Sequence, residues 1–257
     1  MFETDYHVHV DGNPGAARRQ KMQAYAQEAE RWGISRIGFV EHYWNREFAG
    51  YGRWYTPEGP ERIAGLREDL SEARLPEGMR GLLGCETEYN KEGVIPITQE
   101  DVREFDYIIV PHSHINMRGV VTEQDFTYDP EGCARYMEKS FMGVMRHKIA
   151  EHITILAHPF APVGLDDQQD RILSYIADKT FRECARAARD MGIALEVNSL
   201  TWQDKTEEEL RQSQFIRFYR IAREEGCSFV FGSDAHRPQQ YRYLPGARYI
   251  AREAGIL

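Results

Sequence analysis

The stretch Asp5-Tyr6-His7-Val8-His9 ends the first predicted strand, and the rest of the chain is interpreted from it. Successive side chains of a strand alternate in direction, so His7 and His9 project from the same face. Two imidazoles side by side are what a bound metal ion needs from a protein. Taken alone the pair is a weak indication, because a neutral histidine is often only a partly buried polar residue. Its meaning depends on the partners that the rest of the chain supplies.

Length and composition describe an ordinary globular chain. Its 257 residues suffice for one large α/β domain or two small ones, and 42% of them are hydrophobic. The net charge of −9 argues against a nucleic-acid-coating or anionic-membrane protein, so we expect neither kind of partner. No apolar run is long enough to span a bilayer, and residues 1–5 lack the layout of a signal peptide.

The cysteines show no CxxC spacing, which favours reduced, mostly buried thiols over a disulfide framework. We therefore expect a cytoplasmic protein. The cysteines are Cys85, Cys133, Cys184 and Cys227. No repeat, low-complexity tract or linker interrupts the chain, so residues 1–257 are interpreted as one domain.

Apolar, β-rich runs alternate with amphipathic stretches along nearly the whole chain. After the first strand, strands are predicted at 34–40, 81–85, 106–110, 153–157, 193–197 and 228–231. Helices are predicted from the loop after the first strand to about residue 32, and at 58–74, 129–151, 168–191, 206–226 and 243–257.

Seven strand-then-helix units predict an α/β fold with a parallel sheet, and this length suits a closed, TIM-like (β/α)7 barrel. An open doubly wound sheet is the alternative. No Gly-x-Gly-x-x-Gly follows the first strand, which weakens a dinucleotide-binding version of that alternative.

Most of the histidines fall at the carboxyl ends of predicted strands. In a (β/α) barrel these ends meet at one mouth, where active sites lie. The other two, His147 and His152, lie near the opposite end and are interpreted as solvated or capping residues. The residues at the predicted mouth are His7, His9, Glu41, His42, Glu86, His112, His114, His158, Asp234 and His236.

Imidazoles with a few carboxylates form a mixed nitrogen and oxygen ligand set. This set suits Zn²⁺, Mn²⁺ or Fe²⁺ and is too rich in nitrogen for Mg²⁺ or Ca²⁺ alone. One zinc ion needs only three or four protein ligands, so eight or more candidates indicate two or three divalent ions. Glu86 can bridge two of them, and Asp234 and His236 can serve separate ions on the same rim.

Several of these residues have simpler interpretations that remain open at this point. Asp234 follows a Gly-Ser turn and can cap the next helix. Glu41 can ligate an ion directly or orient His42. His112 shares a face with His114 but can also serve only as a hydrogen-bonding group, and Cys85 is more easily explained by core packing.

The pieces that carry a family resemblance span almost the whole chain in the family's order. Together they resemble the PHP family of metal-dependent phosphoesterases (polymerase and histidinol phosphatase domains), and most of all its histidinol-phosphatase-like members. The pieces are Asp5-Tyr6-His7-Val8-His9, Glu41-His42, Gly84-Cys85-Glu86, Phe105-Asp106-Tyr107-Ile108-Ile109 before a histidine, Ala157-His158-Pro159, Leu195-Glu196-Val197-Asn198-Ser199 and Gly232-Ser233-Asp234-Ala235-His236.

The resemblance implies a distorted seven-stranded barrel holding two or three Zn, Mn or Fe ions. By position, one ion would take His7, His9, Glu86 and Asp234. A second would share Glu86 and take His158 with a histidine of the fourth strand, and a third would use His42 and His236.

Two departures from the family pattern concern the ligands. The family's fourth-strand histidine falls at Ser113 here, which leaves His112 or His114, and His114 is preferred because Ile115 matches the apolar residue that usually follows. The family also often has another histidine soon after the His-x-His, and this chain has none. The third ion site would then be weak, assisted by Asp11 or Glu41, or absent.

The function implied by the resemblance is hydrolysis of a small phosphate monoester by a metal-activated water. Histidinol phosphate, from histidine biosynthesis, is the first substrate to consider. Asp234, His236 and Arg237 are the expected catalytic residues, and Arg237, with Arg118 and Arg53 as weaker candidates, is expected to bind phosphate. Asn198 is expected to hydrogen-bond the substrate.

Two other functions stay open at the sequence level. An amidohydrolase would cleave a C–N or C–O bond in a similar metal-lined barrel, but its bridging carboxylated lysine has no counterpart here, since no lysine ends a predicted strand. A non-catalytic metal-binding PHP module is the other alternative, and the nearly complete ligand set argues against it.

Overall fold

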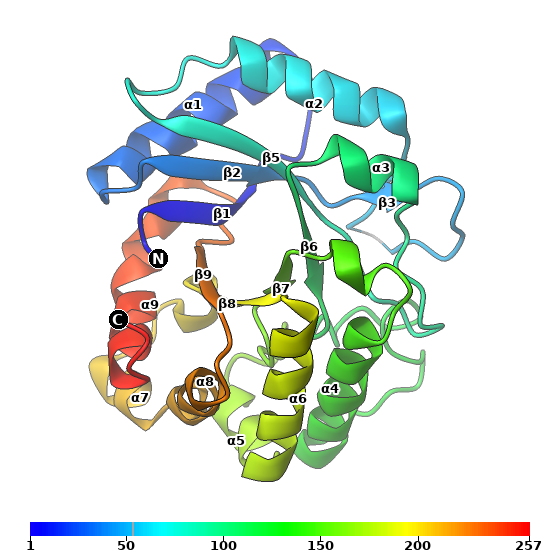
Figure 1. The fold of residues 1–257 in the computed structure, drawn as a ribbon, viewed down its shortest axis with the longest axis vertical. Coiled ribbons are helices and arrows are strands. Elements are labelled where there is room, and N and C mark those ends of the chain that lie inside the picture. The colour runs from blue at the N-terminus through cyan, green and yellow to red at the C-terminus, as the bar shows by residue number, and fades with distance from the viewer. Residues whose placement is uncertain (53) are drawn as a thin grey trace.

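Seven parallel strands close into a barrel in the computed structural model, which describes residues 1–52 and 54–257 (Figure 1). Each strand pairs with the next, and β9 returns to β1 through Asp5 and Phe231. The predicted (β/α)7 barrel is confirmed, and the open sheet is excluded. The strands are β1 (Thr4–His9), β2 (Arg36–Val40), β5 (Arg80–Glu86), β6 (Tyr107–Pro111), β7 (Ile155–Ala157), β8 (Ala194–Asn198) and β9 (Phe229–Gly232).

Helices surround the barrel, as Figure 1 shows. They are α1 (Ala16–Arg31), α2 (Pro60–Glu72), α3 (Gln99–Glu104), α4 (Pro130–Met145), α5 (Gln169–Ser174), α6 (Asp178–Met191), α7 (Glu207–Gln212), α8 (Gln214–Glu224) and α9 (Leu244–Glu253). Short 3₁₀ turns lie at η1 (Ala150–His152), η2 (Leu200–Trp202) and η3 (Pro238–Tyr243), and β3 (Trp44–Asn45) pairs with β4 (Pro57–Glu58) outside the barrel.

The observed helices differ from the predicted ones more than the observed strands do. The strand ends shift by only one or two residues. The helix predicted at 206–226 is two helices, because Ser213 has an extended backbone and its hydroxyl caps the N-terminus of α8. The helix predicted at 168–191 divides before Asp178, where Ala177 is extended, and the one at 129–151 ends at Met145. The short helix α3, opened by a capping box at Thr98, was not predicted.

One tyrosine crosses the inside of the barrel at the end away from the mouth. The Tyr107 hydroxyl donates to the carbonyl of Tyr6 at 2.7 Å. Its ring lies against the backbone of Gly38 and Gly84, where any Cβ would overlap the tyrosine. Both positions therefore require glycine, because the tyrosine ring approaches the backbone so closely. The Tyr107 side chain, from β6, thus contacts three other strands, β1, β2 and β5.

Closure of the barrel depends on a buried carboxylate in β1. Asp5 Oδ1 accepts the N–H groups of His7 and Ser233 at 3.0 and 2.9 Å, and Oδ2 accepts the Tyr241 hydroxyl at 2.7 Å. These bonds tie the first strand to the segment that follows the last one. They also fix the backbone beside His7 and Asp234, two of the predicted metal ligands.

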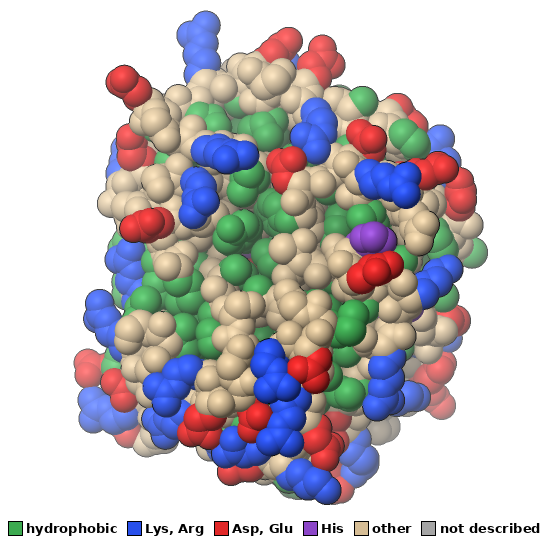
Figure 2. Space-filling model, viewed as in Figure 1, with side chains coloured by type: hydrophobic (Ala, Val, Ile, Leu, Met, Phe, Trp, Pro, Cys, Tyr) green, Lys and Arg blue, Asp and Glu red, His purple; other side chains and the backbone are tan. Residues whose placement is uncertain are grey.

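The outer surface is mixed in charge. On the face shown in Figure 2, Lys and Arg side chains are interspersed with Asp and Glu around uncharged and apolar areas. Within residues 1–52 and 54–257, no helix combines the length and apolar character that crossing a membrane requires.

We predict that Gly84→Ala lowers the free energy of unfolding by about 3 kcal/mol, because the added methyl overlaps the Tyr107 ring. Urea denaturation measures the change. Gly65→Ala in α2 is the matched control, since its Cβ meets no described atom within 4 Å and should be neutral or stabilising. If the overlap is the cause, Gly84→Ala costs much less in a Tyr107→Leu background; an equal cost in both backgrounds would contradict it.

Candidate metal centre

Residues from six of the seven strand ends meet at the mouth and form three groups. Within each group, one possible ligand atom of each residue lies within 4.8 Å of the others. We name them the Asp234 group (His7, His9, Asp234), the Glu86 group (Glu86, His114, His158) and the His236 group (His9, His42, His236).

The Glu86 carboxylate at the end of β5 lies between four imidazoles. Its Oε1 is 3.5 Å from the Nε2 atoms of His7 and His158, and its Oε2 is 3.5 Å from that of His9 and 3.4 Å from that of His42. Tetrahedral zinc with bonds of about 2.1 Å has ligand separations of about 3.4 Å. The buried Oε1 has no hydrogen-bond partner among the described residues. These distances fit a carboxylate shared by two ions.

Each histidine of the three groups is oriented by a contact that its Nδ1 atom makes with another group of the protein. Where Nδ1 faces a carboxylate or carbonyl it carries the proton, which leaves the Nε2 lone pair free, as in known metal sites. The Nδ1 contacts are His7 to Glu196 Oε1 (2.8 Å), His9 and His42 to Asp11 Oδ2 (3.1 Å each), His114 to Glu88 Oε2 (2.7 Å), His158 to Ser113 Oγ (3.1 Å) and His236 to the carbonyl of Asp234 (3.0 Å).

The cluster is strongly acidic for a buried region. Burial alone would lower the pKa of His7, yet Glu196, Asp234 and Glu86 raise it well above the usual value. Burial opposes a similar rise in His9, whose pKa reaches about 9 because of Asp11 and Asp234. Burial would raise the pKa of Glu86, but His7 and its neighbours hold it well below the ordinary value. This concentration of negative charge favours bound cations, and divalent metal ions would balance it.

Asp234 projects into the cluster rather than onto a helix end. Its Oδ1 lies 3.2 Å from His9 Nε2 and 3.7 Å from His7 Nε2. Asp234 and His158 both have positive φ angles, 56° and 28°, in a region that non-glycine residues rarely occupy. Such strain gathers at functional sites, where surrounding contacts maintain it.

Of the two histidines left open by the sequence, the structure brings His114 into the cluster and not His112. The His112 Nδ1 donates to the carbonyl of Met137 at 3.2 Å, and its Nε2 accepts the N–H of Phe160 at 2.9 Å. Both ring nitrogens are therefore occupied by the main chain. Burial lowers the pKa of His112 to about 3, which agrees with the neutral ring that this pair of bonds requires. His112 has no lone pair to offer a metal.

Asn198 is placed to hold Asp234, which differs from the predicted contact with substrate. Its Nδ2 donates to Glu196 Oε2 at 3.0 Å and to Asp234 Oδ2 at 3.2 Å. Its Oδ1 accepts the N–H groups of Leu200 and Thr201 at 2.9 and 3.3 Å. All four hydrogen-bonding positions of the amide are filled within the protein.

The predicted phosphate-binding arginines differ in availability. Arg237 follows His236 directly, is exposed, and has no ion-pair partner among the described residues. Arg118 is occupied elsewhere: its Nε donates to the Tyr128 hydroxyl at 3.1 Å and its guanidinium lies 4.4 Å from that ring. Arg53 lies outside the described residues.

Sequence reasoning gave no role to Glu196, Glu88 or Ser113, which hold ligand histidines from behind. Glu196 is fully buried in β8 and also accepts the N–H of His158 at 2.6 Å. Gly232 permits this, because a Cβ there would overlap Glu196 Oε1. A carboxylate in the middle of an apolar strand was the available signal for Glu196. His147 and His152, interpreted as non-ligands, lie in none of the three groups.

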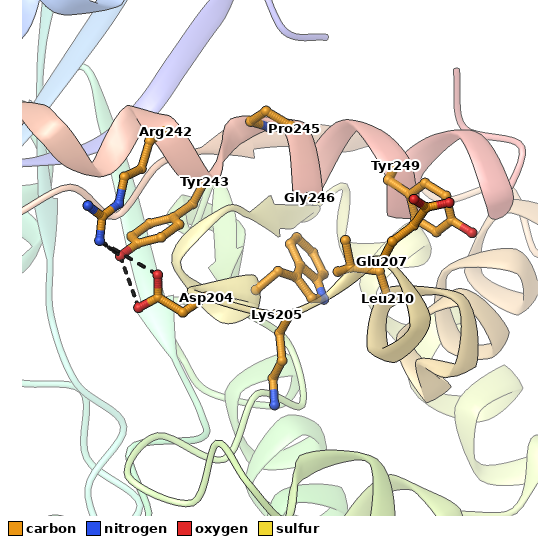
Figure 3. Close-up of a pocket in the computed structure, with 10 residues that line it drawn as sticks. Asp204, Lys205, Glu207, Leu210, Arg242, Tyr243, Pro245, Gly246 and Tyr249 are labelled. Carbon is orange, nitrogen blue, oxygen red and sulfur yellow. Dashed lines mark hydrogen bonds and ion pairs between the residues drawn. The ribbon is translucent and has the colours of Figure 1, made fainter.

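A separate pocket of about 530 Å³ lies between the η2–α7 segment and α9 (Figure 3). Its lining includes Trp202 and Tyr249 but no residue of the three groups. Two of its charged lining residues pair with each other: Asp204 accepts from the Tyr243 hydroxyl at 3.3 Å and lies 3.6 Å from Arg242. The pocket is therefore distinct from the candidate metal centre.

No family model and no curated protein matches this sequence. Solved structures do resemble the chain. One is histidinol phosphate phosphatase from Lactococcus lactis subsp. lactis Il1403, complexed with zinc, L-histidinol and phosphate; the TM-score is 0.61 at 18% identity, over 98% of this chain and 94% of that one. Another, from Listeria monocytogenes, is described as a candidate histidinol phosphatase, with a TM-score of 0.61 at 14% identity, over 92% and 96%. The likeness shows a shared fold.

The two neighbouring histidines should behave in opposite ways on substitution. We predict that His112→Ala lowers the free energy of unfolding by about 2–4 kcal/mol, since it orphans the buried N–H of Phe160 and leaves a cavity. The remaining folded protein keeps its metal content. His114→Ala should instead lose bound metal with a smaller effect on stability. Elemental analysis with thermal unfolding checks both, and metal loss confined to His112→Ala would contradict the assignment.

Proposed function

We propose that the chain is a metal-dependent hydrolase of small phosphate monoesters, similar in activity to histidinol phosphatases. The observation that carries the proposal is the Glu86 carboxylate, surrounded by imidazoles whose Nδ1 atoms are all fixed from behind. The named activity of the two solved structures, and the zinc, L-histidinol and phosphate bound in one of them, support the substrate class.

The proposed ions are Zn, Mn or Fe, two or three in number. His7, His9, Glu86 and Asp234 would hold one ion, and Glu86, His114 and His158 a second. A third would lie between His42 and His236. His9 belongs to two groups but has one free lone pair, so it can serve only one ion. When bound, such ions act as Lewis acids that lower the pKa of water and offset the charge of a phosphate group.

The chain's own residues would bind and orient the phosphate group. Arg237, the exposed residue directly after His236, offers a planar guanidinium, which can donate two parallel hydrogen bonds to phosphate oxygens. His236 is 48% exposed at the side chain, and burial together with the charge of His9 lowers its pKa to about 4. Its imidazole is therefore neutral near pH 7, available as a ligand or a proton acceptor. Asn198 would keep Asp234 in place through its amide N–H.

The competing hydrolase class receives less support from the same residues. A lysine bridging two ions would favour cleavage of C–N or C–O bonds, and no lysine lies in the seven described barrel strands or directly after any of them. Glu86 would take the bridging position instead. A purely structural role would not need an exposed arginine directly after His236.

The decisive experiment joins elemental analysis of the purified protein to a phosphate-release screen over small phosphomonoesters, beginning with histidinol phosphate. Lactones and amides form the second arm. We expect bound Zn, Mn or Fe and turnover in the phosphate arm, lost on chelation and restored by added metal. Turnover only on lactones or amides, or a metal-loaded protein inert on every compound, would overturn the proposal.

His9→Ala and Asp234→Ala should each reduce turnover by more than about 100-fold and remove bound metal, because each deletes a proposed ligand atom of the Asp234 group. Circular dichroism should show the fold intact. His152→Ala is the matched control, a histidine outside the three groups, and should change neither quantity. Full activity in either variant would contradict the proposed role of that residue as a metal ligand.

Arg237→Ala should lower kcat/KM for a phosphomonoester by roughly 100-fold without changing metal content, because it removes a charged donor to the phosphate. Arg118→Ala is the control, since that guanidinium already packs on Tyr128. Steady-state kinetics on both variants checks the difference. Equal effects of the two substitutions would show that Arg237 has no special role.

A further inference from the structure

The loop that follows β1 lacks a histidine, and its Asp11 holds two histidines instead. Asp11 Oδ2 lies 3.1 Å from the Nδ1 atoms of both His9 and His42, and Oδ1 accepts the N–H of His42 at 3.0 Å. The His9 ring stacks on those of His42 and His236, with centroids 4.2 and 4.1 Å away. One carboxylate thus sets the direction of two of the three histidines in the His236 group.

This loop is in turn held by basic side chains from two helices. Lys21 in α1 donates from Nζ to the carbonyl of Asp11 at 3.0 Å. Arg18 in α1 and Arg62 in α2 donate to the carbonyl of Gly12 at 3.1 and 3.3 Å. Three cationic groups therefore hold two consecutive peptide units, the one that carries the Asp11 side chain and the next.

Glu41 fixes the arginines rather than an ion. It directly precedes His42, yet its carboxylate accepts Arg62 Nε at 2.6 Å and Nη2 at 2.7 Å in a bidentate pair. Arg18 Nε lies 3.3 Å from the same carboxylate, and Arg18 Nη1 donates to Asp69 at 2.8 Å. Arg18, Glu41 and Asp69 are each 2–3% exposed. The guanidinium groups are thus locked by geometry as well as charge.

We propose that Lys21 and Arg62 are positioning residues for an ion bound at the His236 group. They hold the backbone of Asp11 and Gly12 so that the Asp11 carboxylate keeps His42 aimed at the same point as His236. The inference rests on the metal-binding part of the proposed function. It concerns residues that touch neither ion nor substrate and act only through Asp11.

The first test measures how many ions bind and how tightly, by chelator competition without substrate. Arg62→Ala and Lys21→Met should each weaken the ion at the His236 group by about 10- to 100-fold and leave the ion at the Glu86 group unchanged. Arg67→Ala is the matched control, an arginine of the same helix that donates to the carbonyl of Glu104 at 2.9 Å. Lys21→Met carries the test alone if Arg62→Ala folds poorly, because Lys21 is only half-buried and forms no ion pair with any described residue.

The second test asks whether both residues act through Asp11. Affinity for the weakened ion should fall no further in Asp11→Ala/Lys21→Met than in Asp11→Ala alone, since residues acting in series are not additive. Unchanged affinity in both Arg62→Ala and Lys21→Met, additive losses in the double variant, or a wild-type protein with no ion at the His236 group would overturn the inference. Because no substrate is used, an absent phosphatase activity would overturn the proposed function and not this one.

Discussion

A buried carboxylate in the middle of a ring of imidazoles is the constraint on which the mouth of this barrel depends. Glu86 has two oxygens and four Nε2 neighbours within 3.5 Å, and none of these atoms is a free donor when each Nδ1 carries the ring proton. Without protons or metal ions between them, the carboxylate oxygens and the Nε2 atoms would face one another as hydrogen-bond acceptors with no donor. Protons or metal ions must lie between them, and the raised pKa of His7, against its burial, reports the same demand.

The barrel meets this demand by gathering residues that lie far apart in the chain. Parallel strands bring all their carboxyl ends to one mouth, so His7 near the start and Asp234 near the end come within 3.7 Å. The hydrogen bonds of Asp5 to the N–H groups of His7 and Ser233 fix that closure at the backbone. The groups that orient these histidines often come from other strand ends, as Glu196 in β8 does for His7, although β9 separates β8 from β1. His42, His114 and His158 are likewise oriented by residues that follow other strands, whereas His9 and His236 contact Asp11 and Asp234, each only two residues away.

The strands, and the residues that gather at the mouth, could be predicted from the sequence, because both follow from local pattern. Apolar runs mark parallel strands, and polar residues just after them mark the mouth. The fourth-strand histidine could not be chosen on the same basis, since His112 and His114 share a face and differ only in which main-chain groups approach them. The N–H of Phe160 that occupies His112 belongs to a loop 48 residues later. The periodicity of the sequence does not predict a contact between residues so far apart in the chain.

The helix boundaries and the roles of Glu196, Glu88 and Asn198 were missed for a related reason. Ser213 splits a predicted helix by capping, a local choice that competes with continued helix and is decided by packing. Asn198 was assigned to substrate because a polar group at a strand end usually faces the mouth. Its amide is instead filled by Glu196, Asp234 and two backbone N–H groups. That all hydrogen-bonding positions of a side chain are filled can be recognised only when the positions of the surrounding strands are known.

The ionic pairs behind the first loop follow the same logic of one element holding another. Buried pairs such as Arg18 with Asp69 and Arg62 with Glu41 seldom stabilise a fold more than apolar side chains of similar size would, because desolvation offsets their attraction. What they add is direction: a bidentate guanidinium fixes two hydrogen bonds in a plane. Here the free N–H groups of the arginines reach the carbonyl of Gly12, next to the carboxylate that orients His9 and His42. Placement of the loop that carries Asp11 gives these charges a reason to be buried that stability alone does not.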